Sequence, residues 1–274
     1  MDKIIEYMLA EDKGFGDITS NAVVEKDKIV NASIVSKDEG ILAGIDIIRE
    51  LFEEYGVEIT LCLKEGVRIS KNDLLISFRG DARTILLLER TALNLIMRMS
   101  GVASAAAEYA DLVKDYGVII AGTRKTSPAI AKFDKYALTV GGADTHRFSL
   151  DDMVLIKDNH IAVCGSPLDA LLKAKKNTSF SKKIEIEVET LDDAIGCVEN
   201  GADIVMLDNM SGEEVKEVVD ELIRLNIRQN SLIEVSGGIT KENILDYVDY
   251  GVDIISIGAL THSSRSLNFS LNIE

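Results

Sequence analysis

The second half of the chain alternates between short apolar runs and longer amphipathic segments. Six apolar runs have the length and composition of buried strands, and they cover residues 117–122, 153–157, 183–188, 203–208, 232–236 and 253–258. The segments between them, such as GEEVKEVVDELIRL, repeat apolar residues at helical spacing. This repeated strand–helix unit predicts a parallel sheet, and at this length a β/α barrel is the first interpretation. A doubly wound open sheet is the alternative.

Six strands are too few for a complete eight-stranded barrel. Either the segment ALTVGG hides another strand or the barrel is incomplete. The first part of the chain has a different rhythm. Residues 4–11 predict a short helix, residues 29–78 contain alternating segments that predict short strands, and residues 84–113 predict a long helix broken near Ser100 and Gly101.

Composition narrows the class of protein. The 274 residues include 30 basic and 46 acidic ones, and the net charge of −16 argues against general binding to nucleic acid or anionic membranes. The N-terminus lacks a signal-peptide pattern, and no apolar run approaches the roughly 20 residues of a membrane span. Cys62, Cys164 and Cys197 are widely spaced, so we expect reduced core thiols in a cytoplasmic protein.

Basic residues gather at the ends of two predicted strands. Arg124 and Lys125 follow the first strand. His146 and Arg147 precede the second strand, and Lys157 ends it. Two arginine forks and two lysines suit a ligand with more than one carboxylate or phosphate. The alternative interpretation is that each cation pairs with a nearby acid, such as Asp134, Asp144, Asp151 or Asp152.

Acidic residues end the next two strands. Glu187 and Asp208 could hold Mg²⁺ or accept hydrogen bonds from ribose hydroxyls. Glu185, Glu187 and Glu189 alternate, so they point to the same side of their strand, toward either the barrel interior or the helices. Burying such a trio would require cationic or metal partners, whereas solvated glutamates at the outer ends would require none.

Glycines follow the last two strands. The motif SGGIT contains Ser236, Gly237 and Gly238, and Gly258 follows the final predicted strand. The loops after the last two strands of a β/α barrel commonly bind phosphate through backbone N–H groups. Glycine after a strand is also ordinary turn chemistry, so both interpretations stay open.

Several stretches in this order resemble the quinolinate phosphoribosyltransferase family: ERTALNLIMRMSGVAS, TRKTSP, KYALTVGGADTHRFSLDDMVLIKDNHI, EIEVETLDDA, IVMLDNMS, EVSGGI and IGALTHS. The resemblance implies an N-terminal α/β sandwich domain, residues 1–101, and an incomplete α/β barrel, residues 102–274, with the final segment packing back on the first domain. It also implies conversion of quinolinate and phosphoribosyl pyrophosphate into nicotinate mononucleotide, pyrophosphate and CO₂ in NAD biosynthesis.

The resemblance further assigns roles to individual residues. Around quinolinate it places Arg124, His146, Arg147 and Lys157. Facing phosphoribosyl pyrophosphate and its Mg²⁺ it places Lys125, Lys157, Glu187 and Asp208 as catalytic residues, the last two as metal ligands. The phosphate-binding loops would contain Ser236, Gly237, Gly238, Gly258 and His262. Arg90 would enter the site of a neighbouring subunit, which implies a homodimer or higher oligomer with shared active sites.

The chain departs from the family pattern near the carboxylate site. The usual GGGxNHRxGL reads GGADTHRFSL, so Ala143, Thr145 and Ser149 replace a glycine, an asparagine and a glycine. The usual DTRKTTPG reads GTRKTSPA, so Gly122 replaces aspartate and Ala129 replaces glycine. THR in place of NHR is similar to the ModD-like proteins, so another aromatic acid is the alternative substrate. A phosphate-binding barrel without activity, or a lyase with Lys157 as a Schiff base, are more distant alternatives.

Overall fold

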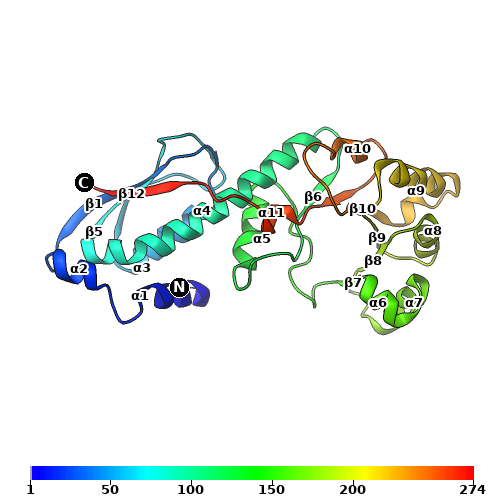
Figure 1. Ribbon diagram of the computed structural model, residues 1–274, viewed down its shortest axis with the longest axis horizontal. Helices are drawn as coiled ribbons and strands as arrows, with labels where there is room; N and C mark the ends of the chain where they lie inside the picture. Colours follow the sequence, from blue (N-terminus) through cyan, green and yellow to red (C-terminus); the bar gives the residue numbers. More distant parts are fainter. Residues whose placement is uncertain (1) are drawn as a thin grey trace. The chain divides into compact units, whose positions relative to one another are not determined.

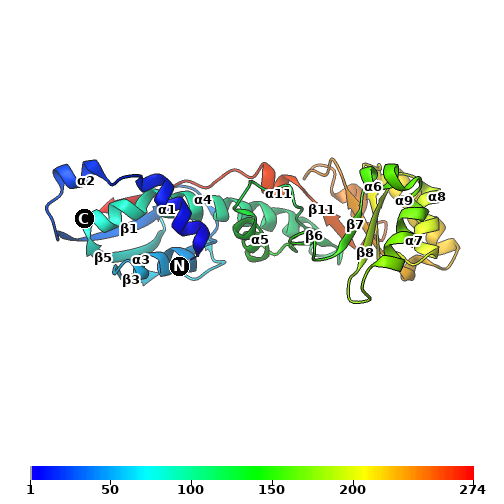
Figure 2. The same ribbon diagram turned by 90° about the horizontal axis from the view of Figure 1, so that it is seen from below.

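The computed structural model describes residues 2–274, which form two compact units (Figures 1 and 2). Unit 1 contains the described residues up to Ala107 together with Thr126–Gly142 and Leu260–Glu274, and unit 2 contains Glu108–Lys125 and Ala143–Ala259. Both units therefore combine segments that are distant in the sequence. The predicted boundary between the two domains at residue 101 stays a prediction. The two compact units of the structure divide the chain at other residues.

Unit 1 is built on an antiparallel sheet with the strand order β12-β1-β5-β3. The strands are β1 (Ile29–Ser36), β3 (Glu58–Cys62), β5 (Leu74–Asp81) and β12 (Phe269–Ile273), and a ribbon pairs β2 (Gly40–Ile41) with β4 (Arg68–Ile69). The end of the chain thus lies beside β1. The helices are α1 (Lys3–Lys13), α2 (Ile18–Val23), α3 (Ile45–Glu54), α5 (Ala131–Val140), α11 (Ala259–His262), and most of α4 (Ala82–Val113). Phe52 of α3 stacks on Phe78 of β5, with ring centroids 4.4 Å apart, in the core between helix and sheet.

Unit 2 is a β/α structure around a parallel sheet with the order β6-β11-β10-β9-β8-β7. Its strands are β6 (Ile119–Ala121), β7 (Val154–Ile156), β8 (Ile184–Val188), β9 (Ile204–Asp208), β10 (Leu232–Ser236) and β11 (Ile254–Ser256). The connecting helices are α6 (Asp158–Cys164), α7 (Pro167–Asn177), α8 (Leu191–Glu199), α9 (Gly212–Arg224), η1 (Arg228–Asn230) and α10 (Leu245–Val248). All six predicted strands are present, and the prediction of an α/β fold with an incomplete barrel is confirmed. Among the described residues, β6 and β7 are the two edge strands of this sheet. The segment ALTVGG contributes the end of helix α5 rather than a strand.

The predicted break in the long helix is wrong. Helix α4 is continuous from Ala82 to Val113. A side chain at Gly101 would place its Cβ 2.2 Å from the carbonyl oxygen of Arg265, so this glycine permits close packing of the C-terminal segment on the helix. The Ser100 hydroxyl binds the backbone of Ala43 and is fully buried. Both small residues therefore serve backbone contacts and do not interrupt the helix.

The three cysteines are free thiols, as predicted, but only Cys197 lies in the core. Burial raises the pKa of the Cys197 thiol to about 11, so this thiol is unreactive at neutral pH. Cys62 and Cys164 are half-buried. Among the described residues, no helix combines the length and apolar character that crossing a membrane would require.

Candidate active site

The carboxyl ends of the unit 2 strands surround a cavity of about 650 Å³. Parallel strands deliver their following loops to one face, which is why residues from seven separate segments meet there. Ten of the predicted site residues line this cavity: Arg124, Lys125, His146, Arg147, Lys157, Glu187, Asp208, Ser236, Gly237 and Gly238. Gly258 comes two residues after β11 and is not part of the lining. Arg90 and His262 belong to unit 1, so unit 2 alone does not bring them to the cavity.

Two arginines lie close together on one side of the cavity. Burial lowers the pKa of the Arg147 guanidinium, and the neighbouring positive charge of Arg124 lowers it further. The negative charge of Glu185, beyond ion-pair distance, partly offsets these effects. Among the described residues, neither arginine has a carboxylate within ion-pair distance. The acids proposed as alternative partners are engaged elsewhere, since Asp134 binds Arg98 and Asp152 accepts the backbone N–H of Phe148. Two adjacent cations without acidic partners form a site for an anion.

The same cavity also contains an acidic pair, Glu187 and Asp208. Lys157 Nζ forms an ion pair with Glu187 Oε2. Burial raises the pKa of the Asp208 carboxyl, and the negative charge of Glu187 raises it further. The two carboxylates are therefore close enough to repel each other, and a divalent cation between them would relieve this repulsion. The donor set consists of oxygens from neighbouring strands and fits Mg²⁺.

The turn after β10 brings backbone N–H groups to the cavity. Gly237 has φ 92° and Gly238 has φ 63°, conformations that favour glycine. At Gly237 a Cβ atom would lie 2.2 Å from Asn209 Oδ1, so the turn and Asn209 fit closely together. Asn209 itself has φ 56° and donates from Nδ2 to Asp208 Oδ2 at 2.6 Å. We did not predict Asn209, although its position directly after Asp208 at a strand end was a usable signal.

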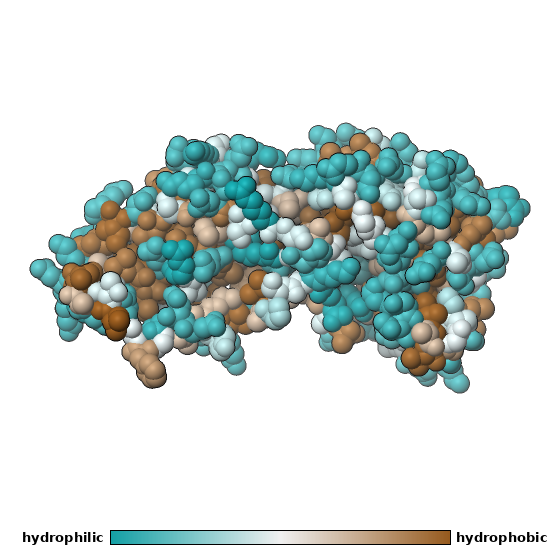
Figure 3. Space-filling model, in the orientation of Figure 1, coloured by the Kyte–Doolittle hydropathy of each residue, from teal (hydrophilic) through white to brown (hydrophobic). Residues whose placement is uncertain are grey.

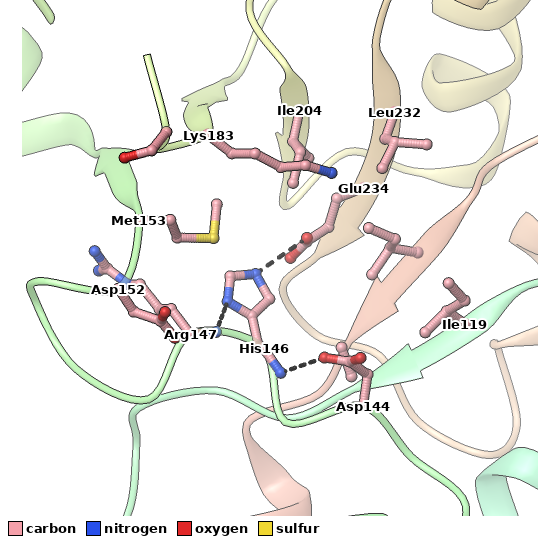
Figure 4. Close-up of a pocket in the computed structure, with 13 residues that line it drawn as sticks. Ile119, Asp144, His146, Arg147, Asp152, Met153, Lys183, Ile204, Leu232 and Glu234 are labelled. Atoms are coloured by element: carbon pink, nitrogen blue, oxygen red, sulfur yellow. Dashed lines mark hydrogen bonds and ion pairs between the residues drawn. The ribbon is translucent and has the colours of Figure 1, made fainter. Parts of the chain in front are cut away.

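His146 lines both this cavity and a second one of about 350 Å³ at the amino ends of the strands (Figure 4). Its Nε2 is 3.2 Å from Glu234 Oε2 and 3.3 Å from Glu185 Oε2. Burial alone would lower the pKa of His146, but the attraction of these two close carboxylates outweighs burial and raises it. The backbone N–H of Arg147 donates to Nδ1 at 2.8 Å. This hydrogen bond uses the lone pair of Nδ1 and therefore opposes protonation of that nitrogen. The ring proton therefore belongs on Nε2, between the carboxylates.

The alternating glutamates of β8 have different environments. Glu185 is fully buried in the barrel interior, Glu187 is buried at the cavity, and Glu189 is exposed. The sequence leaves open whether these side chains face the barrel interior or the helices. In the structure the buried members of the series face the interior. Glu234 was missed, because LIEVS has the composition of an ordinary apolar strand and a single glutamate in it gives no signal of its own.

An open β/α barrel with adjacent unpaired arginines, an acidic pair and a glycine turn around one cavity defines a protein that binds multiply charged anions. Family models match nearly the whole chain: the quinolinate phosphoribosyl transferase N-terminal domain over residues 17–100 and the C-terminal domain over residues 102–272. The chain belongs to the quinolinate phosphoribosyl transferase family.

Individual relatives agree with this assignment. A probable nicotinate-nucleotide pyrophosphorylase [carboxylating] of Methanocaldococcus jannaschii is 47% identical and aligns with 99% of this chain and 96% of its own. The nicotinate-nucleotide pyrophosphorylase [carboxylating] of Rattus norvegicus is 38% identical over 88% of this chain and 81% of its own. Among solved structures, NadC from Streptococcus pyogenes has a TM-score of 0.92 at 36% identity, covering 100% of this chain and 97% of its own.

Proposed function

We propose that the protein is a decarboxylating quinolinate phosphoribosyltransferase. It would convert quinolinate and phosphoribosyl pyrophosphate into nicotinate mononucleotide, pyrophosphate and CO₂, a step of NAD biosynthesis. The observation that carries this proposal is the adjacent Arg124 and Arg147, without acidic partners, in the same cavity as the Lys157–Glu187 ion pair. Relatives that cover nearly the full chain and bear the corresponding name support it.

The basic side of the cavity would bind quinolinate. Arg124 and Arg147 offer planar forks to the two carboxylates, which would replace the acidic partners that both arginines lack. His146 and Lys157 would be the other two residues that bind quinolinate. Because the two guanidinium groups repel each other in the empty cavity, a dicarboxylate gains free energy by neutralising both.

The other sides would bind phosphoribosyl pyrophosphate. Lys125, Lys157, Glu187 and Asp208 would face the ribose and the pyrophosphate, and the phosphate-binding loops would contain Ser236, Gly237, Gly238, Gly258 and His262. Glu187 and Asp208 would hold Mg²⁺, directly or through water. When bound, the ion supplies charge neutralisation of the departing pyrophosphate.

Catalysis in this cavity would depend on positioning and electrostatics. Positive charge develops on the ribose carbon as pyrophosphate leaves, and the carboxylates of Glu187 and Asp208 stabilise it. Lys125 and Lys157 offset the negative charge on the leaving group. Arg124 and Arg147 hold the ring nitrogen of quinolinate toward the ribose carbon. After transfer the bond between C2 and the 2-carboxylate breaks and CO₂ leaves. The electron pair stays on C2, where the positive charge of the neighbouring ring nitrogen stabilises it until a proton from solvent takes the place of CO₂, so no protein nucleophile is needed.

An assay of purified protein with quinolinate, phosphoribosyl pyrophosphate and Mg²⁺ tests the function directly. We expect nicotinate mononucleotide, and we expect EDTA to lower the rate about 100-fold because charge neutralisation by a metal contributes several kcal/mol. Calorimetry should show weaker binding of phosphoribosyl pyrophosphate without Mg²⁺. Full activity in EDTA would exclude the metal role of Glu187 and Asp208, and absence of nicotinate mononucleotide in all conditions would refute the function.

Gly237→Ala is expected to raise the KM for phosphoribosyl pyrophosphate about tenfold or more. The new Cβ would lie 2.2 Å from Asn209 Oδ1 and 2.9 Å from its backbone nitrogen, so the turn and the Asp208–Asn209 segment must move apart. Gly251→Ala is the matched control, since Gly251 has φ 77° and its Cβ would meet only ordinary contact with Val219. Equal effects of the two variants on this KM would show that backbone strain, and not the site, is responsible.

The departures from the family pattern favour a second candidate substrate, another aromatic acid as in ModD-like proteins. Ala143 is buried beside the site segment, and the Thr145 hydroxyl donates to the carbonyl oxygen of His146 at 2.9 Å. These contacts differ from those of glycine and asparagine in the usual pattern. Comparing quinolinate with nicotinate separates the candidates, because a ring with one carboxylate leaves one arginine without a partner.

We also propose a cytoplasmic homodimer, or a higher oligomer, with shared active sites. Apolar side chains are exposed where α1 joins α2 in unit 1, with Phe15 fully exposed, Ile18 at 84% and Val23 at 76% (Figure 3). Such a patch supports contact with another copy. Arg90 is 59% exposed, and its nearest acid, Glu89, is 3.9 Å away, so its guanidinium is available for a ligand outside unit 1. The free cysteines support a reducing compartment.

A further inference from the structure

Two glutamates in the barrel interior take no part in the mechanism above. Glu185 of β8 and Glu234 of β10 are both fully buried. Among the described residues, both carboxylate oxygens of Glu185 and Oε1 of Glu234 have no hydrogen-bond partner. Buried carboxylates with unused acceptors destabilise a fold, and well-packed apolar residues would be at least as stable. Their presence therefore indicates a role beyond stability.

Both glutamates approach the same imidazole. Figure 4 shows the His146 ring pointing into the barrel, with Nε2 directed at Glu234, and Glu185 Oε2 is 3.3 Å from the same nitrogen. The backbone of His146 has φ 53°, which is uncommon for a residue with a side chain. Its N–H donates to Asp144 Oδ1 at 2.6 Å. The turn is thus held at the backbone by Asp144 and at the ring by the two glutamates.

This turn sets the direction of the next side chain. Arg147 follows His146 directly, and its N–H donates to Nδ1 of the His146 ring. The ring orientation and the Arg147 backbone are therefore coupled. Arg147 is 9% exposed and adjacent to Arg124, so burial and like-charge repulsion oppose the position of its guanidinium, and the negative charge of Glu185 offsets them only in part. Holding it there requires a rigid support.

We propose that Glu185 and Glu234 are positioning residues that clamp the His146 ring from inside the barrel and thereby direct Arg147 toward the carboxylates of the substrate. The proposal deepens the proposed function and rests on it for the identity of the ligand.

The competing explanation for the two buried glutamates is that they bind a metal ion together with His146. The three ligand atoms lie within 4.8 Å of one another, as they would around a cation. However, Nδ1 accepts the Arg147 N–H, so the ring proton occupies Nε2, the nitrogen that would have to coordinate the metal. The geometry points to a clamp in which Glu234 hydrogen-bonds Nε2 and Glu185 holds the same nitrogen electrostatically at 3.3 Å.

The test uses Glu185→Gln and Glu234→Gln in the whole chain, with Glu189→Gln, the exposed glutamate directly after β8, as the control. Each variant loses one negative charge and keeps the side-chain shape. We expect the Kd of quinolinate, measured by calorimetry, to rise about tenfold in both interior variants, because a small displacement of a binding group has effects of this size or larger. The Kd of phosphoribosyl pyrophosphate should stay within about twofold, since its binding groups lie elsewhere in the cavity. Glu189→Gln should leave the Kd of quinolinate within about twofold.

Nitrogen NMR of the ring gives an independent measurement. The chain has three histidines, so His146 can be assigned by comparison with His160→Asn and His262→Asn variants. We expect the wild-type ring to carry its proton on Nε2, and the Glu234→Gln ring signals to shift and broaden as the ring becomes mobile. Glu234→Asp, which keeps the negative charge on a shorter side chain, should restore the wild-type ring signals only in part.

Three results would overturn the clamp: unchanged or tighter quinolinate binding, equal weakening of both substrates, or a His146 ring spectrum that both glutamine variants leave unaltered. If wild-type protein binds no quinolinate, the proposed function fails, and the ring spectra still decide whether the glutamates hold His146. Added Zn²⁺ or Mn²⁺ that shifts the His146 signals and raises the melting temperature would favour the metal explanation and overturn the clamp.

Discussion

Arg147→Ala is expected to raise the KM for quinolinate about 10- to 150-fold, because charge-assisted hydrogen bonds contribute about 1.5–3 kcal/mol. The melting temperature should not fall. Arg147 is buried beside Arg124 without an ion-pair partner, so removing its charge relieves repulsion in the unliganded protein. Steady-state kinetics with both substrates and a thermal melt check the two expectations.

Arg228→Ala is the matched control for the loss of an arginine. Its guanidinium pairs with Asp253 and binds the carbonyl oxygens of Ser231 and Gly251, so it joins backbone segments of unit 2. This control should lower the melting temperature and leave the KM for quinolinate within about twofold, the reverse of Arg147→Ala. Unchanged kinetics in Arg147→Ala would remove this residue from the substrate pocket.

The sheet of unit 2 could be predicted because each of its strands is buried on both faces. Runs such as DIVMLD and DIISIG are apolar throughout, and polar residues begin where the strand ends. The same rule placed Lys157, Glu187 and Asp208 on one face, since parallel strands end together. Ten of the seventeen residues that line the cavity are therefore among the site residues predicted from the sequence.

The errors come from contacts that are distant in the sequence. Gly101 was interpreted as a helix break, whereas the backbone at Arg265, 164 positions later, requires a glycine there. Glu234 was missed because its partner, His146, is 88 residues away. Pairing across such distances depends on the order of the strands in the sheet, which periodicity alone does not contain.

Arg90 and His262 belong to unit 1, so, unlike the other predicted site residues, they are not positioned by the strands of the parallel sheet. Arg90 lies in helix α4 of unit 1, where it lines a separate cavity of about 450 Å³ together with Glu11, Asp12 and Arg98. Its assignment to a neighbouring subunit's site comes from the family resemblance alone. That assignment makes a quantitative prediction about mixed oligomers.

Subunits carrying Arg90→Ala, mixed with subunits carrying Arg147→Ala, should recover about a quarter of wild-type activity at a quinolinate concentration near the wild-type KM, at which each variant alone should have little activity. In a symmetric oligomer with shared sites, each site takes Arg147 from one subunit and Arg90 from its neighbour. After random exchange, half of the sites have an intact Arg147, and half of those have an intact Arg90 from the neighbour.

Exchange is verified by purifying mixed oligomers through a tag on one variant, and Arg147→Ala subunits mixed with untagged copies of themselves give the baseline. If each site uses the Arg90 of its own subunit, every site in the mixture carries one defect and no activity returns. Activity at the baseline in oligomers that have exchanged would therefore contradict the shared site. Such a result would leave Arg147 in the pocket, since its effect on quinolinate binding is measured independently of the partner.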